Sequence, residues 1–283
     1  MKVSRITVLG AGVMGHCIAQ VAAQAGFEVY LRDIKEDFLN RGMESIRKSL
    51  NKLVSKGKIS EEEARKALER IKPTLDLKEA VGKADLIIEA VPEDVNIKKE
   101  VFKEVDFLAP GHAIIASNTS SISITELASV TSRPEKVCGM HFFNPPQLMK
   151  LVEVIRGAKT SDETVEVVVE IARKMGKEPV VIKKDSPGFI VNRILFAALN
   201  EAAQLVYEGV ASVEDVDKAV KLGLNWPMGP FALMDLIGVD TTLQILNVLH
   251  SELGERYRPS ALIKEKVRAK LLGRKSGEGF YKY

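Results

Sequence analysis

A glycine-rich turn near the start of the chain constrains the fold more than any other stretch. The apolar run Ile6–Leu9 enters a turn with glycines at positions 10, 12 and 15, and a helical pattern follows up to Gly26. This is G-x-G-x-x-G in the setting that it requires, with a strand before it and a helix after it. Gly10 permits the tight turn, Gly12 lets the backbone approach a pyrophosphate, and Gly15 lets the helix pack close to the strand. The helix N-terminus then offers free N–H groups and a partial positive charge to phosphates.

A second apolar run ends on an acidic residue at the distance expected for a dinucleotide site. Phe27–Leu31 leads directly to Arg32 and Asp33, and Asp33 lies 18 residues beyond Gly15, close to the spacing of about 20 that is typical of such sites. Its carboxylate can accept hydrogen bonds from ribose hydroxyls and repels a 2′-phosphate, which favours NAD over NADP. Arg32 leaves NADP open, because an arginine turned inward would pair with that phosphate. The other interpretation is a Rossmann-like fold with a degenerate site.

The bulk composition limits the class of protein. A chain of 283 residues is long enough for one large domain or two smaller ones, and its net charge of +3 gives no case for nucleic acid or a membrane surface as a partner. Cys17 and Cys138 make no disulfide framework, and no metal-ligand spacing appears, so we expect no metal and a reducing, cytoplasmic location. The first strand begins almost at once, which leaves no room for a signal peptide. The apolar-rich stretch Phe189–Val206 contains charged and amide residues and predicts a buried helix of a soluble protein.

A helical hairpin is expected to interrupt the strand and helix alternation at about residues 36–71. Apolar residues recur at helical spacing from Leu39 to Leu53, and Ser60 to Glu63 is typical of a capping box that opens a second helix. The first helix and the turn after it carry six basic residues against the single acid Glu44; the basic residues are Arg41, Arg47, Lys48, Lys52, Lys56 and Lys58. The ordinary interpretation is a solvated face, and the alternative is a surface for a phosphate-rich ligand.

The remaining pattern predicts an α/β protein of two domains. Strands are expected at 85–91, 113–117, 137–142, 151–155 and 179–182, with helices between several of them. This alternation predicts a Rossmann-like, doubly wound, mostly parallel sheet over residues 1–184. Ser186 can cap a helix and Pro187 can fill its first position. From there to the end only helical patterns occur, so residues 185–283 are expected to form an all-α domain.

Several polar residues follow the expected strands, where open α/β sheets bind their ligands. Ser117 and Asn118 follow one strand, and His141 and Asn144 follow another. Glu153 lies inside an apolar strand, where a carboxylate needs a partner. Each of these residues also has a structural explanation when taken alone, as a helix cap, a packed side chain or a residue on a solvated edge.

The ordered set of motifs along the whole chain resembles the L-3-hydroxyacyl-CoA dehydrogenase family, and within it the 3-hydroxybutyryl-CoA dehydrogenases of bacteria and archaea. The matching stretches are Gly-Ala-Gly-Val-Met-Gly at 10–15, Glu-Ala-Val-Pro-Glu at 89–93, Ser-Asn-Thr-Ser-Ser at 117–121, His-Phe-Phe-Asn-Pro at 141–145, Lys-Leu-Val-Glu-Val at 150–154, Asp-Ser-Pro-Gly-Phe-Ile-Val-Asn-Arg at 185–193, Pro-Met-Gly-Pro at 227–230 and Lys-Ser-Gly-Glu-Gly-Phe-Tyr at 275–281. Such a set is far more specific than the glycine motif.

The resemblance implies a set of residue roles in hydride transfer between NAD and a short (S)-3-hydroxyacyl-CoA. His141 would be the general base for the 3-hydroxyl, held and polarised by Glu153. Ser117 and Asn192 would bond the substrate oxygens, with Asn192 coming from the helical domain. The cofactor contacts would be Gly10, Gly12, Val13, Met14, Gly15, Asp33, Glu93, Lys98, Ser117, Asn144 and Lys275. Ser49 and Lys56 on the hairpin would contact coenzyme A, which would give the basic hairpin its purpose.

Two other readings stay open beside this one. The first is a dehydrogenase for a 3-hydroxy acid without coenzyme A, such as a sugar acid, which is an activity of some relatives of this fold. The one-sided charge of the hairpin at 41–58 favours the thioester. A binding protein without turnover, like certain lens crystallins related to the family, or a regulator that binds acyl-CoA would keep the fold but would not need the set Ser117, His141, Glu153 and Asn192. The family commonly forms homodimers through the helical domain, so a homodimer is expected, although a monomer would equally bury the apolar helices against its own α/β domain.

Overall fold

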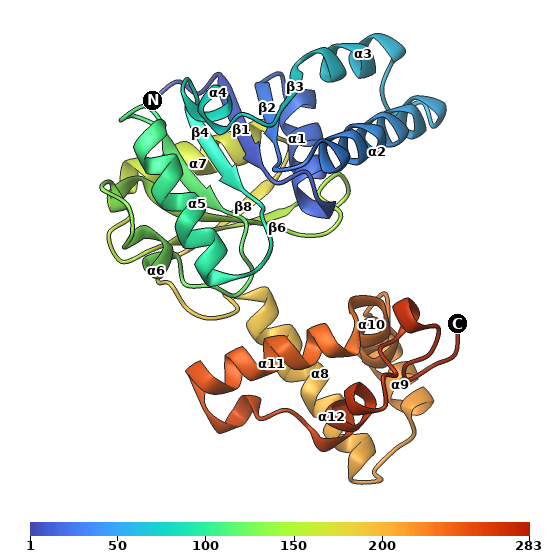
Figure 1. Ribbon diagram of the computed structural model, residues 1–283. Coiled ribbons are helices and arrows are strands. Elements are labelled where there is room, and N and C mark those ends of the chain that lie inside the picture. The colour runs from blue at the N-terminus through green and yellow to red at the C-terminus, as the bar shows by residue number, and fades with distance from the viewer. The chain divides into compact units, whose positions relative to one another are not determined.

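The computed structural model describes residues 1–283, and the chain divides into two compact units, residues 1–185 and residues 186–283. The first unit is a sheet with helices and the second is built of helices alone (Figure 1). The predicted fold class, a Rossmann-like α/β domain with an inserted helical hairpin followed by an all-α domain, is confirmed.

The first unit contains one sheet of eight strands in the order β3-β2-β1-β4-β5-β6-β7-β8. The strand order reverses between β1 and β4, which is the switch point at which doubly wound sheets bind ligands. Every neighbouring pair is parallel except β6 and β7. The strands are β1 (Arg5–Leu9), β2 (Glu28–Arg32), β3 (Ile71–Thr74), β4 (Leu86–Glu89), β5 (Ile114–Ser117), β6 (Val137–Phe142), β7 (Leu151–Arg156) and β8 (Glu178–Ile182).

Helices cover both faces of this sheet, as the alternation of its side chains requires. Ile6 and Val8 of β1 belong to a core shared with α1, α2, α3 and α7, whereas the Thr7 hydroxyl between them donates to the Ala80 carbonyl of α4 at 2.5 Å. The hairpin of α2 and α3 extends beyond the edge of the sheet (Figure 1). The helices are α1 (Val13–Gln24), α2 (Glu36–Ser55), α3 (Glu61–Glu69), α4 (Leu77–Val81), α5 (Val95–Leu108), α6 (Ile124–Ala128), the 3₁₀ turn η1 (Pro134–Lys136) and α7 (Asp162–Lys174).

Close backbone contacts at three glycines join β1, α1 and α2. A Cβ atom at Gly15 would lie 1.7 Å from the Gly10 carbonyl oxygen, and one at Gly10, whose φ is +98°, would lie 2.5 Å from the Ala90 carbonyl oxygen. On the other side of the turn, a Cβ atom at Gly42 of α2 would lie 3.0 Å from the Ala11 carbonyl oxygen. The hairpin therefore packs directly onto the glycine turn.

The second unit is a helical domain closed by the C-terminal tail. Phe231, Met234 and Leu246 lie in its core. The buried Asp235 carboxylate accepts hydrogen bonds from the N–H groups of Phe280 and Tyr281, both at 2.9 Å, which fixes the tail. The helices are α8 (Val191–Tyr207), α9 (Val213–Gly223), α10 (Pro230–Ile237), α11 (Val239–Leu253) and α12 (Ala261–Arg268), with 3₁₀ turns η2 (Glu255–Tyr257) and η3 (Arg274–Ser276).

Two local predictions are wrong. The second hairpin helix was expected to run to about Ile71, but it ends at Glu69, and Ile71 begins the strand β3. With four residues and Pro73 among them, β3 is too short for a recognisable strand pattern, and proline is tolerated there because the strand lies at the edge of the sheet. The Ser60 to Glu63 capping box that opens the same helix is confirmed.

The second error concerns the start of α8. Ser186 was expected to cap this helix with Pro187 in its first turn, but the helix begins at Val191 with Ile190 at the cap position. Positive φ angles at Gly188 and Phe189, +71° and +48°, prevent a helical backbone there. The Ser186 hydroxyl instead accepts a hydrogen bond from Arg193 at 3.0 Å.

No single helix is both long and apolar enough to cross a membrane. The pair α10 and α11, bent by 97° at the break between them, passes such a test of length and composition only when the two are taken together.

Candidate active site

One cavity of about 930 Å³ joins the glycine turn to the histidine at the end of β6. Gly10 and Gly12 line it after the end of β1, and His141 and Asn144 line it near the end of β6, three strands away in the sheet. It also reaches Arg41 of the hairpin. Since β1, β4, β5 and β6 are parallel, their carboxyl ends meet at this edge of the sheet and bring these residues together.

The glycine turn fits a dinucleotide. Gly10 and Gly15 are demanded by packing within the protein, but a Cβ atom at Gly12 would meet nothing within 4 Å. Packing within the protein therefore does not require a glycine at position 12, and the missing side chain leaves open space beside the turn. Gly12 is also the N-cap of α1, where no side chain caps the helix and no acid lies in the first turn. The N–H groups of this helix end and its partial positive charge thus remain for phosphates.

Asp33 is positioned by the same turn. One oxygen of its carboxylate accepts the Ala11 N–H at 2.6 Å and the other accepts the Ile34 N–H at 2.6 Å, which holds the carboxylate at the rim of the cavity. Arg32 also lines the cavity, and its Nε donates to the Leu75 carbonyl at 3.3 Å.

The His141 and Glu153 side chains form a buried pair. His141 of β6 and Glu153 of β7 are direct partners in the antiparallel register, so both side chains project from the same face of the sheet. Nδ1 of His141 lies 2.8 Å from Oε2 of Glu153, and the two residues are 5% and 1% exposed. The imidazole ring also packs against Phe143, with ring centroids 4.6 Å apart. The reversal of β7 is therefore what gives the histidine its carboxylate partner.

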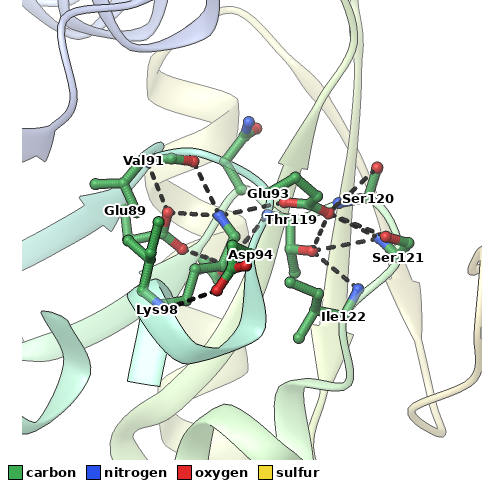
Figure 2. Close-up of polar contacts among 12 residues, drawn as sticks. Glu89, Val91, Glu93, Asp94, Lys98, Thr119, Ser120, Ser121 and Ile122 are labelled. Atoms are coloured by element: carbon green, nitrogen blue, oxygen red, sulfur yellow. Dashed lines mark hydrogen bonds and ion pairs between the residues drawn. The ribbon is translucent and has the colours of Figure 1, made fainter. Parts of the chain in front are cut away.

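A second set of charged residues lies where β4 ends. Glu89, the last residue of β4, is fully buried, and its Oε1 accepts the Lys98 ammonium at 2.6 Å and the Val91 N–H at 2.7 Å. Lys98 of α5 is itself buried and also lies 3.2 Å from Oε2 of Glu93. Figure 2 shows Lys98 between the two carboxylates.

Glu93 in turn organises the loop after β5. Its Oε1 accepts the Thr119 hydroxyl at 2.5 Å, the Ser120 N–H at 3.0 Å and the Ser121 hydroxyl at 3.1 Å (Figure 2). Partial burial opposes ionisation of this carboxyl, but the Lys98 ammonium and these hydrogen bonds outweigh it and hold the pKa of Glu93 below its ordinary value. The loop that carries Ser120 therefore depends on an ionised Glu93.

The structure places Ser117 differently from the expectation that it bonds substrate. Ser117 is fully buried, its hydroxyl donates to Oε2 of Glu89 at 2.6 Å, and it does not line the cavity. A role for this hydroxyl at the substrate does not fit that position. Asn118 and Ser120 do line the cavity, and Asn118 joins two strand ends by accepting the Phe142 N–H at 2.9 Å. Four hydroxyl residues occur between 117 and 121, and spacing alone could not tell which of them faces outward.

Other expected site residues fall into three groups. Val13, Met14, Glu93, Lys98 and Asn144 line the cavity, whereas Gly15 lies behind it against Gly10. Ser49 and Lys56 lie on α2 and at its end, outside the cavity lining. Asn192 and Lys275 belong to the helical unit, where the Lys275 ammonium pairs with Asp240 at 2.5 Å. The roles of all these residues remain predictions.

Sequence reasoning missed Glu89 as a site residue, although a signal was present. Glu89 ends the apolar run Leu86–Ile88, and a carboxylate in such a run requires a partner. The same need for a partner marked Glu153 as a candidate site residue. Elsewhere, no group of three or more His, Cys, Asp or Glu residues is arranged to hold a metal ion. Burial raises the pKa of the Cys138 thiol to about 12, so this residue is an unreactive thiol of the core.

A dinucleotide turn that shares a cavity with the histidine of a buried histidine–glutamate pair defines an NAD-dependent dehydrogenase. The NAD binding domain of 3-hydroxyacyl-CoA dehydrogenase matches residues 5–186, and the C-terminal domain of the same enzyme matches residues 188–283. The chain belongs to the 3-hydroxyacyl-CoA dehydrogenase family.

The similarity to known proteins extends over nearly the full length of the chain. A probable 3-hydroxybutyryl-CoA dehydrogenase of Deinococcus radiodurans is 53% identical over 98% of this chain and 99% of its own. The 3-hydroxybutyryl-CoA dehydrogenase of Clostridioides difficile is 48% identical over 99% of both chains. Among solved structures, the (S)-3-hydroxybutyryl-CoA dehydrogenase of Ralstonia eutropha superimposes with a TM-score of 0.97 at 44% identity, covering 100% of this chain and 99% of the other.

The hydrogen bond from Ser117 to Glu89 predicts different effects of two serine substitutions on stability. Ser117→Ala would leave Oε2 of the buried Glu89 without this donor and should lower the free energy of unfolding by about 1–3 kcal/mol. Ser120→Ala removes a partly exposed hydroxyl and should change it by less than about 0.5 kcal/mol. Urea denaturation of both variants beside the parent protein measures the difference. A neutral Ser117→Ala would show that this bond does not hold Glu89.

Proposed function

We propose that the protein oxidises (S)-3-hydroxyacyl-CoA, with 3-hydroxybutyryl-CoA as the first candidate, to the 3-oxoacyl-CoA with NAD, and catalyses the reverse reduction. The observation that carries this proposal is the single cavity that holds both the dinucleotide turn and His141. Relatives named as 3-hydroxybutyryl-CoA dehydrogenases match the whole chain, which supports the same reaction here. A bare cofactor-binding protein would have no use for a buried base beside the turn.

His141 acts on the proton of the 3-hydroxyl in this proposal. Glu153 accepts a hydrogen bond from Nδ1–H, so Nε2 is the basic nitrogen of the neutral ring. When bound, NAD supplies the hydride acceptor for C3. As the hydride leaves C3, Nε2 takes the hydroxyl proton, and the Glu153 carboxylate stabilises the imidazolium that forms. In the reverse reduction the same imidazolium returns the proton to the carbonyl oxygen. General base catalysis of this kind contributes about 10²–10⁴-fold.

Positioning of the substrate is assigned to residues around this base. Ser120 lines the cavity beside Asn118, so we propose its hydroxyl, in place of the Ser117 hydroxyl, as the donor to the substrate oxygen. Asn192 keeps its proposed role as a second polar contact from the helical unit. Glu93, Lys98 and Asn144 are the proposed contacts to the nicotinamide half of the cofactor, because they line the part of the cavity that also holds His141. Lys275 is proposed as a further contact.

An absorbance assay tests the reaction directly. With the purified protein, NADH should be oxidised when acetoacetyl-CoA is added, and NADPH or free acetoacetate in its place should give little or no turnover. Turnover of free acetoacetate at a similar rate would favour a dehydrogenase of 3-hydroxy acids without coenzyme A. Tight NADH binding without turnover would favour a binding protein instead.

The His141→Ala variant tests the role of this residue in the mechanism. It should lower kcat by at least about a hundredfold, since the general base is removed, while the affinity for NAD measured by calorimetry stays nearly unchanged. A large loss of NAD affinity would mean that His141 supports the cofactor or the core rather than proton transfer.

The hairpin is proposed to hold the phosphorylated end of coenzyme A. Arg41, Ser45 and Ser49 follow one another at four-residue spacing on α2, and Lys52 and Lys56 continue the stripe, so all five share one face. Arg41 and Ser45 line the cavity, so this face leads away from it. At a rise of about 1.5 Å per residue, the stripe extends roughly 22 Å beyond Arg41. A long thioester with its phosphates at the far end fits this arrangement.

A charge reversal on the hairpin tests its role. Lys56→Glu should raise the KM for acetoacetyl-CoA roughly tenfold and leave the KM for NADH unchanged, because a charge-assisted contact becomes a repulsion. Lys103→Glu is the matched control, since Lys103 is an exposed lysine of α5 and the net charge changes equally. Equal effects of the two variants would contradict a specific role for the hairpin.

We further propose a homodimer formed through the helical unit and a cytoplasmic location. Leu222, Leu224 and Leu236 of this unit are 77%, 64% and 50% exposed, and an exposed apolar surface favours association. Sedimentation at micromolar concentration should give twice the mass of the chain, and a single-chain mass would reject the dimer. Both cysteines are free, which supports a reducing compartment.

A further inference from the structure

The cluster of Glu89, Lys98 and Glu93 carries more negative than positive charge. Lys98 is the one cation that contacts the two carboxylates, at 2.6 Å from Glu89 and 3.2 Å from Glu93. With both carboxylates ionised, the formal charge of the cluster is −1. Glu89 and Lys98 are 0% and 1% exposed, so water screens this charge poorly.

The excess charge lies beside the part of the cavity proposed for the nicotinamide. Glu93 and Lys98 line the cavity together with His141 and Asn144. The arginines that line the cavity, at positions 32 and 41, lie at the end of β2 and on α2. The local field is therefore negative at the histidine end.

We infer that Glu89 shifts the binding equilibrium of this site toward the oxidised cofactor relative to the reduced one. The nicotinamide ring is positively charged in NAD⁺ and neutral in NADH, so a fixed negative charge nearby stabilises only the oxidised form. At an effective dielectric constant of about 20, one unit charge within about 10 Å shifts such an equilibrium by roughly tenfold. The inference rests on the proposed function, which places the nicotinamide beside His141. Tighter binding of NAD⁺ makes the bound cofactor a weaker oxidant by the same factor.

Glu89 is the position at which a charge can be removed without changing a contact to the cofactor. It does not line the cavity, so a substitution there alters the field without touching the cofactor. Glutamine has the same shape: its oxygen can still accept from Val91 N–H and Lys98, and its amide can donate to the Ser117 hydroxyl oxygen. In Glu89→Gln the Lys98 ammonium would keep Glu93 as its carboxylate partner, and the formal charge of the cluster would become zero.

The test measures two dissociation constants in the absence of substrate. NAD⁺ binding is followed by calorimetry and NADH binding by fluorescence, for the full-length parent protein and for Glu89→Gln. The ratio of the Kd for NAD⁺ to the Kd for NADH should rise roughly tenfold in the variant, mainly through weaker binding of NAD⁺. Glu126→Gln is the matched control, because it removes a carboxylate from the exposed Lys99–Glu126 pair on the neighbouring helices. That variant should leave the ratio unchanged.

The outcomes separate charge from structure. If Glu89→Gln leaves the ratio of the two Kd values unchanged, even where it weakens the binding of both cofactor forms, Glu89 only supports the fold and the inference is wrong. If Glu89→Gln does not fold, Glu93→Gln removes the same unit of charge at a side chain that is 40% exposed. Glu93 is itself a proposed cofactor contact, so the Kd of either form can change in this variant, but the lost charge acts on the positively charged ring of NAD⁺ and not on NADH. The ratio should therefore rise as before, and an unchanged ratio would again reject the inference. Normal turnover of acetoacetyl-CoA with an unaltered ratio would reject this inference alone, whereas failure of the parent protein in that assay would reject the proposed function.

Discussion

The close approach of two backbone segments at Gly10 and Gly15 is the constraint on which the rest of the structure depends. No side chain fits at Gly15, since its first atom would lie 1.7 Å from the Gly10 carbonyl oxygen. This contact sets the start of α1 at the end of β1, and with it the N–H groups that face the cavity. The parallel strands then bring their carboxyl ends to the same edge. The histidine and the charged cluster are placed relative to the turn by the sheet itself.

Features fixed by one residue type at one spacing could be predicted from the sequence. The glycine turn, Asp33 and the need of Glu153 for a partner belong to this kind, and the structure adds the register that pairs Glu153 with His141. The two-part fold followed from the loss of strand patterns near residue 184. The fold class and the close packing of the glycine turn could be predicted because burial of apolar residues and backbone geometry leave few alternatives at such positions. The domain limits at 1–184 and 185–283 and the role of Asp33 at the cofactor remain predictions.

Features decided by loop geometry could not be read from spacing. Which hydroxyl after β5 faces the cavity depends on the turn around Glu93, so Ser117 was chosen where the structure exposes Ser120 to the cavity. The start of α8 depends on positive φ angles at Gly188 and Phe189, and a residue such as Phe189 gives no warning of them. The strand β3 is defined by pairing with β2 rather than by its own four residues.

The contact at Gly42 has a consequence for how related enzymes can diverge. Since α2 rests on Ala11 in the glycine turn, the base of the hairpin and the cofactor turn share one fixed origin. Insertions or deletions near Gly57, where the two helices of the hairpin meet, would alter the far end of the surface and leave that origin in place. Under the proposed function, the binding of the coenzyme A part of the substrate can thus evolve separately from the alignment of the reacting carbon.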